Sequence, residues 1–315
     1  FFHANKIING MHTYHTGLYT FEAKYPFRPR RIISDPILWP DPKTRPDDPN
    51  TVNVIFAGSA VILGNAFVVP HGVYDRWTEC RKFEKADLEA KLVPISPPDD
   101  FEYREGCNDP KIWQAISGGY DEYKLKRLDL RGATVIDIGA HIGIASREFL
   151  SRGASVIHCY EPDPRNVELL RKNLAKYDGV RIFDRPAWSH KTAMALDVRE
   201  DPSHNQIGVS SDGPILAEGI EDVILRANAV RKDVDALFVL KIDCEDSEGA
   251  IIPAAEHLLH LFDVVVGEWH SYFSLSACRS ALLAAGFAFE TSDPKAPGGI
   301  FFAQKPRGES VAKIA

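Results

Sequence analysis

The chain has no excess of positive charge. Its 315 residues include 37 lysines and arginines against 44 acidic residues, which gives a net charge of −7. Binding to a nucleic-acid backbone depends on clustered basic side chains that neutralise phosphates. We therefore expect no nucleic acid as the main partner.

Cysteine is sparse, and long apolar runs are absent. The five cysteines form no Cys-x-x-Cys pair, which argues against a disulfide framework or a zinc site and favours a reducing cytoplasm. The longest apolar stretch, 54–69, is interrupted by glycine, serine and asparagine and is too short to span a bilayer, so we expect no membrane segment. No secretory leader is visible, and a chain that begins Phe1-Phe2 is expected to be a fragment or a trimmed protein.

The dinucleotide fingerprint Gly-x-Gly-x-x-Gly is also missing. Instead, the apolar run 134–138 leads into a loop with the sequence Gly-Ala-His-Ile-Gly (139–143) and then into a helical pattern. A second apolar run, 154–160, ends at Glu161. A strand, a glycine turn, a helix and a second strand that ends in an acid form a nucleotide cradle, in which the acid accepts hydrogen bonds from ribose hydroxyls.

The charge beside this loop indicates which nucleotide it holds. Asp137 lies two residues before Gly139 and would repel a diphosphate, but it suits a ligand with a cationic amino-acid end. S-adenosylmethionine carries both an ammonium and a sulfonium group. We predict that it is the cofactor, with Glu161 as the ribose acid. The alternative is an ordinary turn whose glycines only permit close packing, with Asp137 accepting from backbone N–H groups.

The chain is expected to have two parts, 1–104 and 105–315. Residues 1–50 lack periodicity and suggest an extended or loop arm, 51–72 predict two or three short strands with a hairpin turn at 64–65, and 77–92 predict a charged helix. This β-containing extension is rich in aromatic and histidine side chains. We expect it to serve either as a lid or acceptor-binding element, or as the contact of a homodimer.

From residue 105 onward the pattern predicts an α/β domain. The predicted helices are 111–116, 144–151, 165–176, 220–227, 249–258 and 275–285, and the predicted strands are 134–138, 154–160, 180–183, 237–242, 264–268, 287–291 and 299–304. An antiparallel excursion (193–198 and 206–209) interrupts this rhythm. The alternation predicts a doubly wound, mostly parallel sheet. Its last two strands have no room for a crossover helix, so they must form an antiparallel hairpin.

Three further segments carry a family resemblance. Lys-Ile-Asp-Cys-Glu (241–245) ends one predicted strand, Glu-Trp-His (268–270) ends the next, and Arg-Pro-Ala-Trp-Ser (185–189) lies between them and the glycine loop. Together with that loop and Tyr-Glu-Pro (160–162), they resemble the FkbM family of S-adenosylmethionine-dependent methyltransferases over roughly residues 105–305. The family usually has glycine where this chain has Asp246 and asparagine where it has His141.

The resemblance implies a Rossmann-like methyltransferase fold and O-methylation of a hydroxyl, on a small molecule, a sugar or a glycosylated natural product. Two alternatives stay open: a binding module that kept the fold and lost catalysis, and a nucleotide-dependent oxidoreductase. The residue pattern and the resemblance together predict a cofactor site at Asp137, Gly139, Ala140, His141, Gly143, Glu161, Pro162, Ala187 and Asp243.

Methyl transfer from a sulfonium needs alignment and a proton acceptor. His270 is the expected general base, because an unperturbed imidazole titrates near neutrality. Glu268 and Glu245 are expected to orient it or to bind acceptor hydroxyls, while Lys241 either takes part in catalysis or pairs with a carboxylate such as Asp243. These acids and His270 could also bind Mg²⁺ or Mn²⁺. Because they alternate along strand ends, only some can face one way, and we expect a site without a metal.

Overall fold

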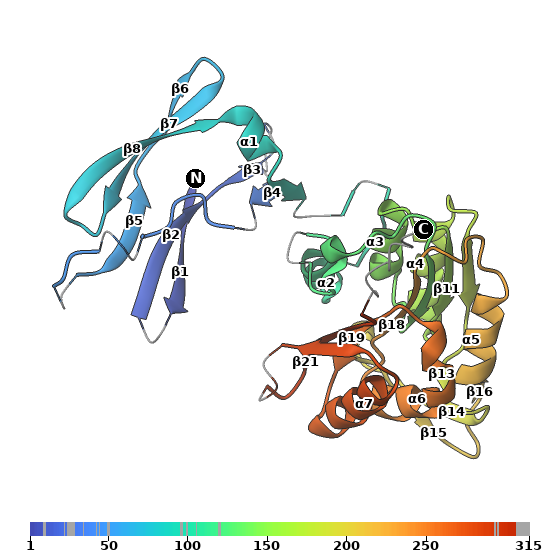
Figure 1. Ribbon diagram of the computed structural model, residues 1–315. Helices are drawn as coiled ribbons and strands as arrows, with labels where there is room; N and C mark the ends of the chain where they lie inside the picture. Colours follow the sequence, from blue (N-terminus) through green and yellow to red (C-terminus); the bar gives the residue numbers. More distant parts are fainter. Residues whose placement is uncertain are drawn as a thin grey trace, which may run out of the picture. The chain divides into compact units, whose positions relative to one another are not determined.

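The computed structural model describes residues 1–306 apart from positions 9–10, 22, 24–28, 34, 42, 44, 49–50, 95–96, 99, 105, 119–120, 293 and 295. The chain divides into two compact units, Phe1–Pro98 with Gly118–Tyr120, and Asp99–Ser117 with Asp121–Ala315 (Figure 1). Residues 100–104, which we had assigned to the N-terminal extension, therefore belong to the second unit. Within the described ranges, no helix is long and apolar enough to cross a membrane.

The first unit is built from strands. Its larger sheet has the order β1-β2-β5-β7-β6, with β8 also paired to β7. These strands are β1 (Phe2–Ile8), β2 (Met11–Gly17), β5 (Asn53–Ala57), β6 (Val61–Leu63), β7 (Ala66–Val73) and β8 (Trp77–Glu84). A smaller sheet contains β3 (Tyr19–Phe21), β4 (Pro29–Ile33) and β9 (Leu92–Pro94). The strands expected over 51–72 are confirmed, and the extended structure expected within 1–50 takes the form of strands β1 to β4 rather than of a loop.

The helix predicted over 77–92 is wrong. All of β8 pairs antiparallel with β7, from Val73 opposite Trp77 to Ala66 opposite Glu84, and only α1 (Lys85–Glu89) is helical. Nearly every side chain of β8 is exposed, so its sequence lacks the apolar alternation that marks a half-buried strand. Continuous pairing with a neighbour outweighs the weak helical preference of a charged segment.

The second unit contains a seven-stranded sheet with the order β12-β11-β10-β18-β19-β21-β20. Its strands are β10 (Thr134–Ile138), β11 (Val156–Tyr160), β12 (Val180–Phe183), β18 (Phe238–Ile242), β19 (Val264–Trp269), β20 (Ala288–Thr291) and β21 (Gly299–Gln304). All neighbours pair in parallel except β21, which is antiparallel to both β19 and β20. The predicted parallel sheet with a terminal antiparallel hairpin is confirmed.

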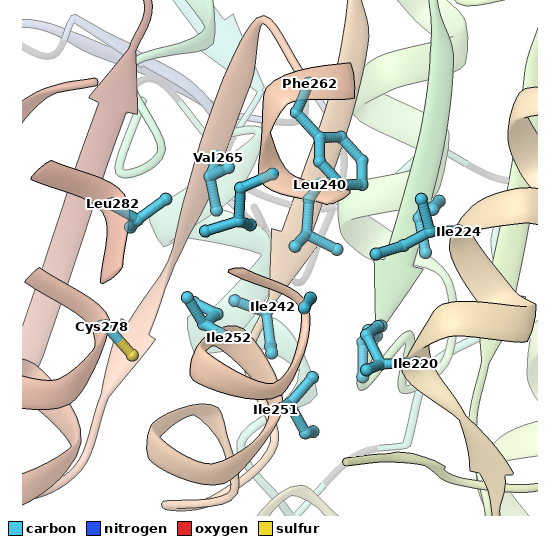
Figure 2. Packing of buried hydrophobic residues seen from close by; sticks show 14 of the residues in the cluster. Ile220, Ile224, Leu240, Ile242, Ile251, Ile252, Phe262, Val265, Cys278 and Leu282 are labelled. Atoms are coloured by element: carbon cyan, nitrogen blue, oxygen red, sulfur yellow. The ribbon is translucent and has the colours of Figure 1, made fainter. Parts of the chain in front are cut away.

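Helices cover both faces of this sheet. One face packs against α2 (Asp109–Ile116), α3 (Ile144–Ser151) and α4 (Pro164–Leu174), and the other against α5 (Ile220–Asn228), α6 (Glu248–Ala254) and α7 (Tyr272–Ala284). Figure 2 shows Ile220 and Ile224 of α5 on the same side as Leu240 of β18. Because β10, β11 and β18 are buried along their whole length, their sequences are apolar without alternation.

The remaining short elements lie between the main strands. The expected antiparallel excursion is confirmed by β14 (Ala193–Asp197) and β15 (Gln206–Val209), with β16 (Ile215–Leu216) on the other side of β14. β13 (Ala187–Trp188) pairs with β17 (Glu218–Gly219). The described part of the unit also contains the 3-10 turns η1 (Leu125–Arg127), η2 (Pro202–His204) and η3 (Glu256–Leu261). The helix predicted over 249–258 therefore ends early and continues as η3.

His158 of β11 makes stability depend on pH. Its side chain is 0% exposed, and neither ring nitrogen has a hydrogen-bond partner among the described residues. Burial lowers the pKa of His158 to about 4, below the value near 6.5 of an unfolded chain. Between these two values the unfolded state binds more protons, so stability is complete above pH ~6.5 and is lost as the pH falls towards ~4.

Wild type should lose free energy of unfolding as the pH falls from ~6.5 to ~4. We expect His158→Val to reduce this loss by roughly 3 kcal/mol. The measurement is urea unfolding of wild type and variant at several values between pH 4 and pH 7. His257→Gln is the control, because its ring is exposed. If the free energy of unfolding changed equally with pH in wild type and in His158→Val, His158 would not be the cause of the loss.

Candidate active site

A cavity of about 620 Å³ lies at the carboxyl edge of the parallel strands. Its walls come from the ends of β11, β10, β18 and β19, which are consecutive in the sheet, and from α2 and the segment 202–207. In doubly wound sheets, ligands collect at this edge beside the point where strand order reverses. The volume is in the usual range for small-molecule sites.

The glycine loop passes very close to the end of β18. Gly139 has a φ of +74°, and a Cβ added to it would lie 1.7 Å from the carbonyl oxygen of Asp243. A Cβ on Gly143, whose φ is +91°, would lie 2.9 Å from Leu170 Cδ1. Gly139 lines the cavity, whereas Gly143 faces α4 and does not. The second glycine thus serves close packing, as the alternative interpretation held.

Asp137 lies beneath the loop rather than in the cavity wall. Its carboxylate is fully buried, accepts a hydrogen bond from Ser146 Oγ at 2.6 Å, and lies 3.0 Å from Lys241 Nζ. Lys241 also donates to the carbonyl of Gly139 at 2.6 Å. Burial alone would lower the pKa of Lys241, but Asp137 and Asp243 raise it. Asp137 is therefore paired within the protein, and Lys241 is its partner.

Glu161 connects the cavity to the loop. Its Oε2 accepts from the backbone N–H of His141 at 2.8 Å, and its Oε1 accepts from the N–H of Asp163 at 2.9 Å and from Asn166 Nδ2 at 3.2 Å. Burial raises the pKa of Glu161 to about 7. A carboxylate has about four acceptor positions. The three bonds therefore leave one position for a ligand hydroxyl.

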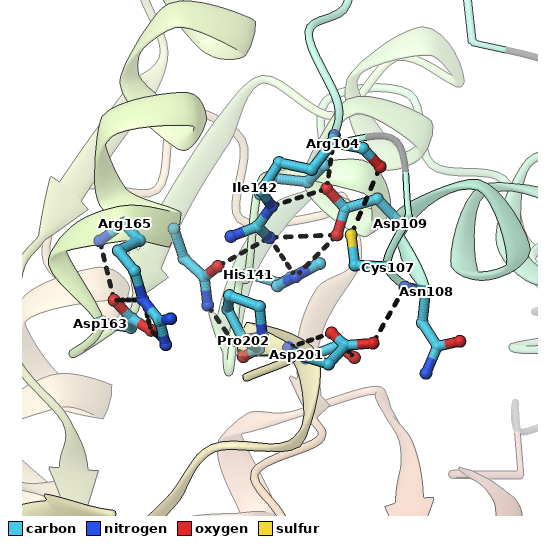
Figure 3. A network of polar contacts seen from close by, with 12 residues as sticks. Arg104, Cys107, Asn108, Asp109, His141, Ile142, Asp163, Arg165, Asp201 and Pro202 are labelled. Atoms are coloured by element: carbon cyan, nitrogen blue, oxygen red, sulfur yellow. Dashed lines mark hydrogen bonds and ion pairs between the residues drawn. The ribbon is translucent and has the colours of Figure 1, made fainter. Parts of the chain in front are cut away.

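Arg104 holds the other side of the loop and was missed by the sequence analysis. Its Nη2 donates to Asp109 Oδ1 at 3.0 Å and to Asn166 Oδ1 at 2.9 Å, and lies 3.0 Å from His141 Nε2 (Figure 3). Burial lowers the pKa of His141 to about 4, so the neutral imidazole can accept from the guanidinium. Arg104 lies in a segment without periodicity, so no sequence signal marks it.

A cluster of carboxylates surrounds His270 where β18 and β19 end. His270 Nε2 lies 3.9 Å from Asp243 Oδ1, 3.9 Å from Glu245 Oε2 and 3.8 Å from Glu268 Oε1. On the other side of the ring, Nδ1 lies 3.3 Å from Glu248 Oε1. The ends of β18 and β19 thus bring together the four predicted residues Asp243, Glu245, Glu268 and His270. Glu248, the first residue of α6, joins this cluster.

These carboxylates change the titration of the imidazole. Burial alone would lower the pKa of His270, but Glu248 and the neighbouring acids raise it to about 9. Burial raises the pKa of Glu268 to about 8 and also raises that of Glu245. The imidazole is therefore protonated at neutral pH. The premise of an unperturbed histidine, on which the general-base role rested, is wrong.

Every predicted site residue except Asp137 and Gly143 lines the cavity. Lining residues that the sequence analysis missed include Asn108, Lys111, Ile112, Ala115, Ile116, Glu122, Tyr123, Asn166 and the segment 202–205. Tyr123 donates from its hydroxyl to Asp243 Oδ2 at 3.0 Å. Most of these residues come from α2 and the turns beside it, and only packing brings them to the sheet edge.

No family model and no curated protein matches this chain. Among solved structures, precorrin-6y C5,15-methyltransferase from Geobacter metallireducens is similar at 17% identity and a TM-score of 0.39, over 68% of this chain and 100% of that chain. Aeropyrum pernix fibrillarin with natively bound S-adenosyl-L-methionine is similar at 10% identity and a TM-score of 0.39, over 79% of this chain and 100% of that chain.

Likeness at this level carries no argument about activity. The fold rests on the sheet itself: the order β12-β11-β10-β18-β19-β21-β20 with β21 antiparallel is that of a Rossmann-like methyltransferase fold. The second unit has this fold, and the first unit adds further strands to the chain.

Gly139→Ala should destabilise the protein by more than the cost of a positive φ alone. Gly286, with a φ of +85° and nothing within 4 Å of an added Cβ, is the matched control. We expect Gly286→Ala to cost about 1–2 kcal/mol in free energy of unfolding, and Gly139→Ala to cost clearly more because of the clash with Asp243. Urea unfolding measures both. Equal losses would show that the loop can move away from β18.

Proposed function

We propose that this chain is an S-adenosylmethionine-dependent O-methyltransferase of the FkbM type that acts on a hydroxyl of a sugar or glycosylated small molecule. One observation carries the proposal. The loop at Gly139 and the acid Glu161 share a single cavity with the cluster around His270, on adjacent strand ends. A nucleotide cradle and a set of proton-accepting groups are thus close enough for transfer between two bound molecules.

The cofactor half fits the residues that line it. Glu161 has one acceptor position left for a ribose hydroxyl, and Gly139 exposes backbone beside it. Apolar side chains that line the cavity suit a flat base: Pro162, Ala187, Leu196 and Ile207. When bound, S-adenosylmethionine supplies a methyl group on a sulfonium. The net charge under the loop is small, because Lys241 pairs with Asp137.

The acceptor half lies at the ends of β18 and β19. Carboxylates of Glu245 and Glu268, both partly exposed, can accept hydrogen bonds from the hydroxyls of a sugar. Transfer forms an O–C bond and breaks the S–C bond, whose electron pair stays on sulfur, and the hydroxyl proton has to leave to the protein. Because His270 already carries a proton, the carboxylates of Asp243 and Glu245 beside it are the groups placed to receive the hydroxyl proton.

The departures from the family pattern do not favour a decayed site. His141 and Asp246 have φ values of +51° and +79°. Glycine and asparagine adopt this left-handed region readily, and histidine and aspartate are also enriched there. Asp246 accepts a hydrogen bond from Ser271 Oγ at 2.6 Å, which helps to hold its conformation. Both substitutions are therefore accommodated by the backbone.

We expect Glu161→Gln to weaken binding of S-adenosylhomocysteine by at least about tenfold, since its carboxylate anchors the loop and is placed for a ribose. Isothermal calorimetry measures the affinity, and circular dichroism checks the fold. Glu168→Gln on α4 is the control, because that carboxylate is exposed. Unchanged affinity in Glu161→Gln would remove the ribose assignment, and tight NADH binding would favour an oxidoreductase.

His270→Ala should lower kcat on the order of a hundred- to ten-thousand-fold, because it removes the cation that positions the proton-accepting carboxylates of Asp243 and Glu245, while the affinity for S-adenosylhomocysteine stays within about threefold. Tritium transfer from labelled S-adenosylmethionine into a panel of glycosides measures the rate. His260→Ala, on the exposed turn η3, is the matched control. Retention of more than about a tenth of the wild-type rate would contradict a central role for His270.

A separate outcome of that assay addresses the binding-module alternative. If the wild-type protein binds S-adenosylhomocysteine normally but transfers no label to any hydroxyl acceptor, the chain is better described as a module that kept the fold and lost catalysis.

A further inference from the structure

The imidazole of His270 faces more negative charge than it can satisfy. Three carboxylates lie 3.8–3.9 Å from Nε2, which is too far for a hydrogen bond, and the fourth, on Glu248, lies 3.3 Å from Nδ1 without forming one. Lys241 also lies at the end of β18, but its Nζ is 4.0 Å from Asp243 Oδ2. It is closer to Asp137 Oδ1, at 3.0 Å. Among the described residues, His270 is the only cationic side chain within 4.0 Å of Glu245, Glu248 and Glu268, and it carries at most one positive charge.

Glu248 makes this arrangement harder to explain without a ligand. Its side chain is 0% exposed. Oε1 accepts from the backbone N–H of Cys244 at 2.7 Å, while Oε2 has no hydrogen-bond partner among the described residues. A buried carboxylate oxygen without a donor is costly, and native proteins rarely leave one so. Glu248 belongs to the same cluster, since its carboxylate lies within 4.8 Å of ligand atoms of Asp243 and His270.

We propose that Asp243, Glu248 and His270 bind a divalent metal ion. Ligands that are each about 2.0–2.3 Å from a shared ion lie roughly 3–4.5 Å apart. The separations here, up to 4.8 Å within the trio, need only small side-chain shifts. One imidazole with several carboxylates suits an ion such as Mn²⁺, which accepts both nitrogen and oxygen ligands.

A bare ion fits this position better than an organic cation. An alkylammonium has to place a hydrogen within reach of each carboxylate, and its carbon chain cannot follow it to the fully buried Glu248. A metal ion bonds to lone pairs directly and needs only a small opening. The site is also beside the proposed acceptor position, because Asp243, Glu245 and His270 all line the cavity.

This proposal replaces our expectation of a site without a metal. That expectation assumed that the acids follow strand alternation. However, β18 ends at Ile242, and Glu245 and Asp246 then turn the chain with φ values of +54° and +79°. The turn lets Asp243 and Glu245 both approach His270.

The role of the ion rests on the proposed function. A divalent cation beside the acceptor can bind its hydroxyl oxygen and lower the pKa of that hydroxyl, so that the proton leaves to a neighbouring carboxylate before or during transfer. His270 then acts as a ligand of the metal rather than as the general base. Binding of the ion can be measured without any methyl transfer.

Mn²⁺ binding to the full chain tests the proposal directly. Titration with the electron paramagnetic resonance signal of free Mn²⁺ should show one saturable site in the wild type, from which excess Mg²⁺ displaces the probe. We expect Asp243→Asn, Glu248→Gln and His270→Ala each to weaken Mn²⁺ binding by about tenfold or more. Thermal melting checks that each variant is folded, and Glu248→Gln keeps the side-chain volume.

Glu122→Gln is the matched control. It removes a carboxylate from the same cavity wall, but Glu122 is outside the trio. We expect it to change Mn²⁺ affinity by less than about threefold, because Glu122 supplies no ligand atom and acts only through its charge. An equal loss of Mn²⁺ affinity in Glu122→Gln and Glu248→Gln would mean general attraction of cations to an acidic cavity and would overturn the proposal. So would the absence of wild-type binding near 1 mM Mn²⁺, which is about the weak limit of protein sites for such ions.

Calorimetry with S-adenosylhomocysteine, run on the same samples, separates the two proposals. Normal binding of that ligand without Mn²⁺ binding removes the metal site and leaves the methyltransferase assignment in place. Mn²⁺ binding without S-adenosylhomocysteine binding supports the metal site and removes the proposed cofactor.

Discussion

The buried ion pair between Lys241 and Asp137 is the contact on which the site depends. The two residues are direct neighbours in the register of β18 and β10, and Lys241 also donates to the carbonyl of Gly139. One ammonium therefore ties two strands and the glycine loop together at the edge where strand order reverses. Removing either partner would leave an uncompensated buried charge, which is strongly destabilising. The loop owes its position to this pair as much as to its glycines.

The same pair divides the cavity electrostatically. Lys241 is paired beneath the loop and lies 4.0 Å from Asp243, so it does little to offset Asp243, Glu245, Glu248 and Glu268. Burial and the neighbouring acids raise the pKa values of Glu245 and Glu268. The loop side presents backbone groups and apolar side chains, whereas the side formed by β18 and β19 presents carboxylates and one imidazole. A cofactor with a flat base suits the first side, and hydroxyls or a metal ion suit the second. The proposed separation into a cofactor side and an acceptor side therefore follows from the pairing of Lys241 with Asp137.

Elements buried on both faces were the most predictable part of the chain. β10, β11 and β18 give continuous apolar runs, and the acids that follow them mark the sheet edge. β8 was missed because its side chains are exposed and its pairing with β7 leaves no apolar pattern. Within the site, the sequence could place Asp137 and Lys241 on their strands, but only the register makes them partners. Arg104 and Glu248 contribute through packing between distant segments, which no local pattern records.

Backbone strain surrounds the same cavity. His141, Glu245 and Asp246 all have positive φ values although none is glycine, at about 1–3 kcal/mol each. Such conformations persist only where neighbouring contacts hold them, and here Arg104 contacts His141 while Ser271 donates to Asp246. At His141 the strained backbone aims an N–H at Glu161, and at Glu245 it brings a carboxylate near His270. Two of the strained residues thus contribute groups to the two halves of the cavity.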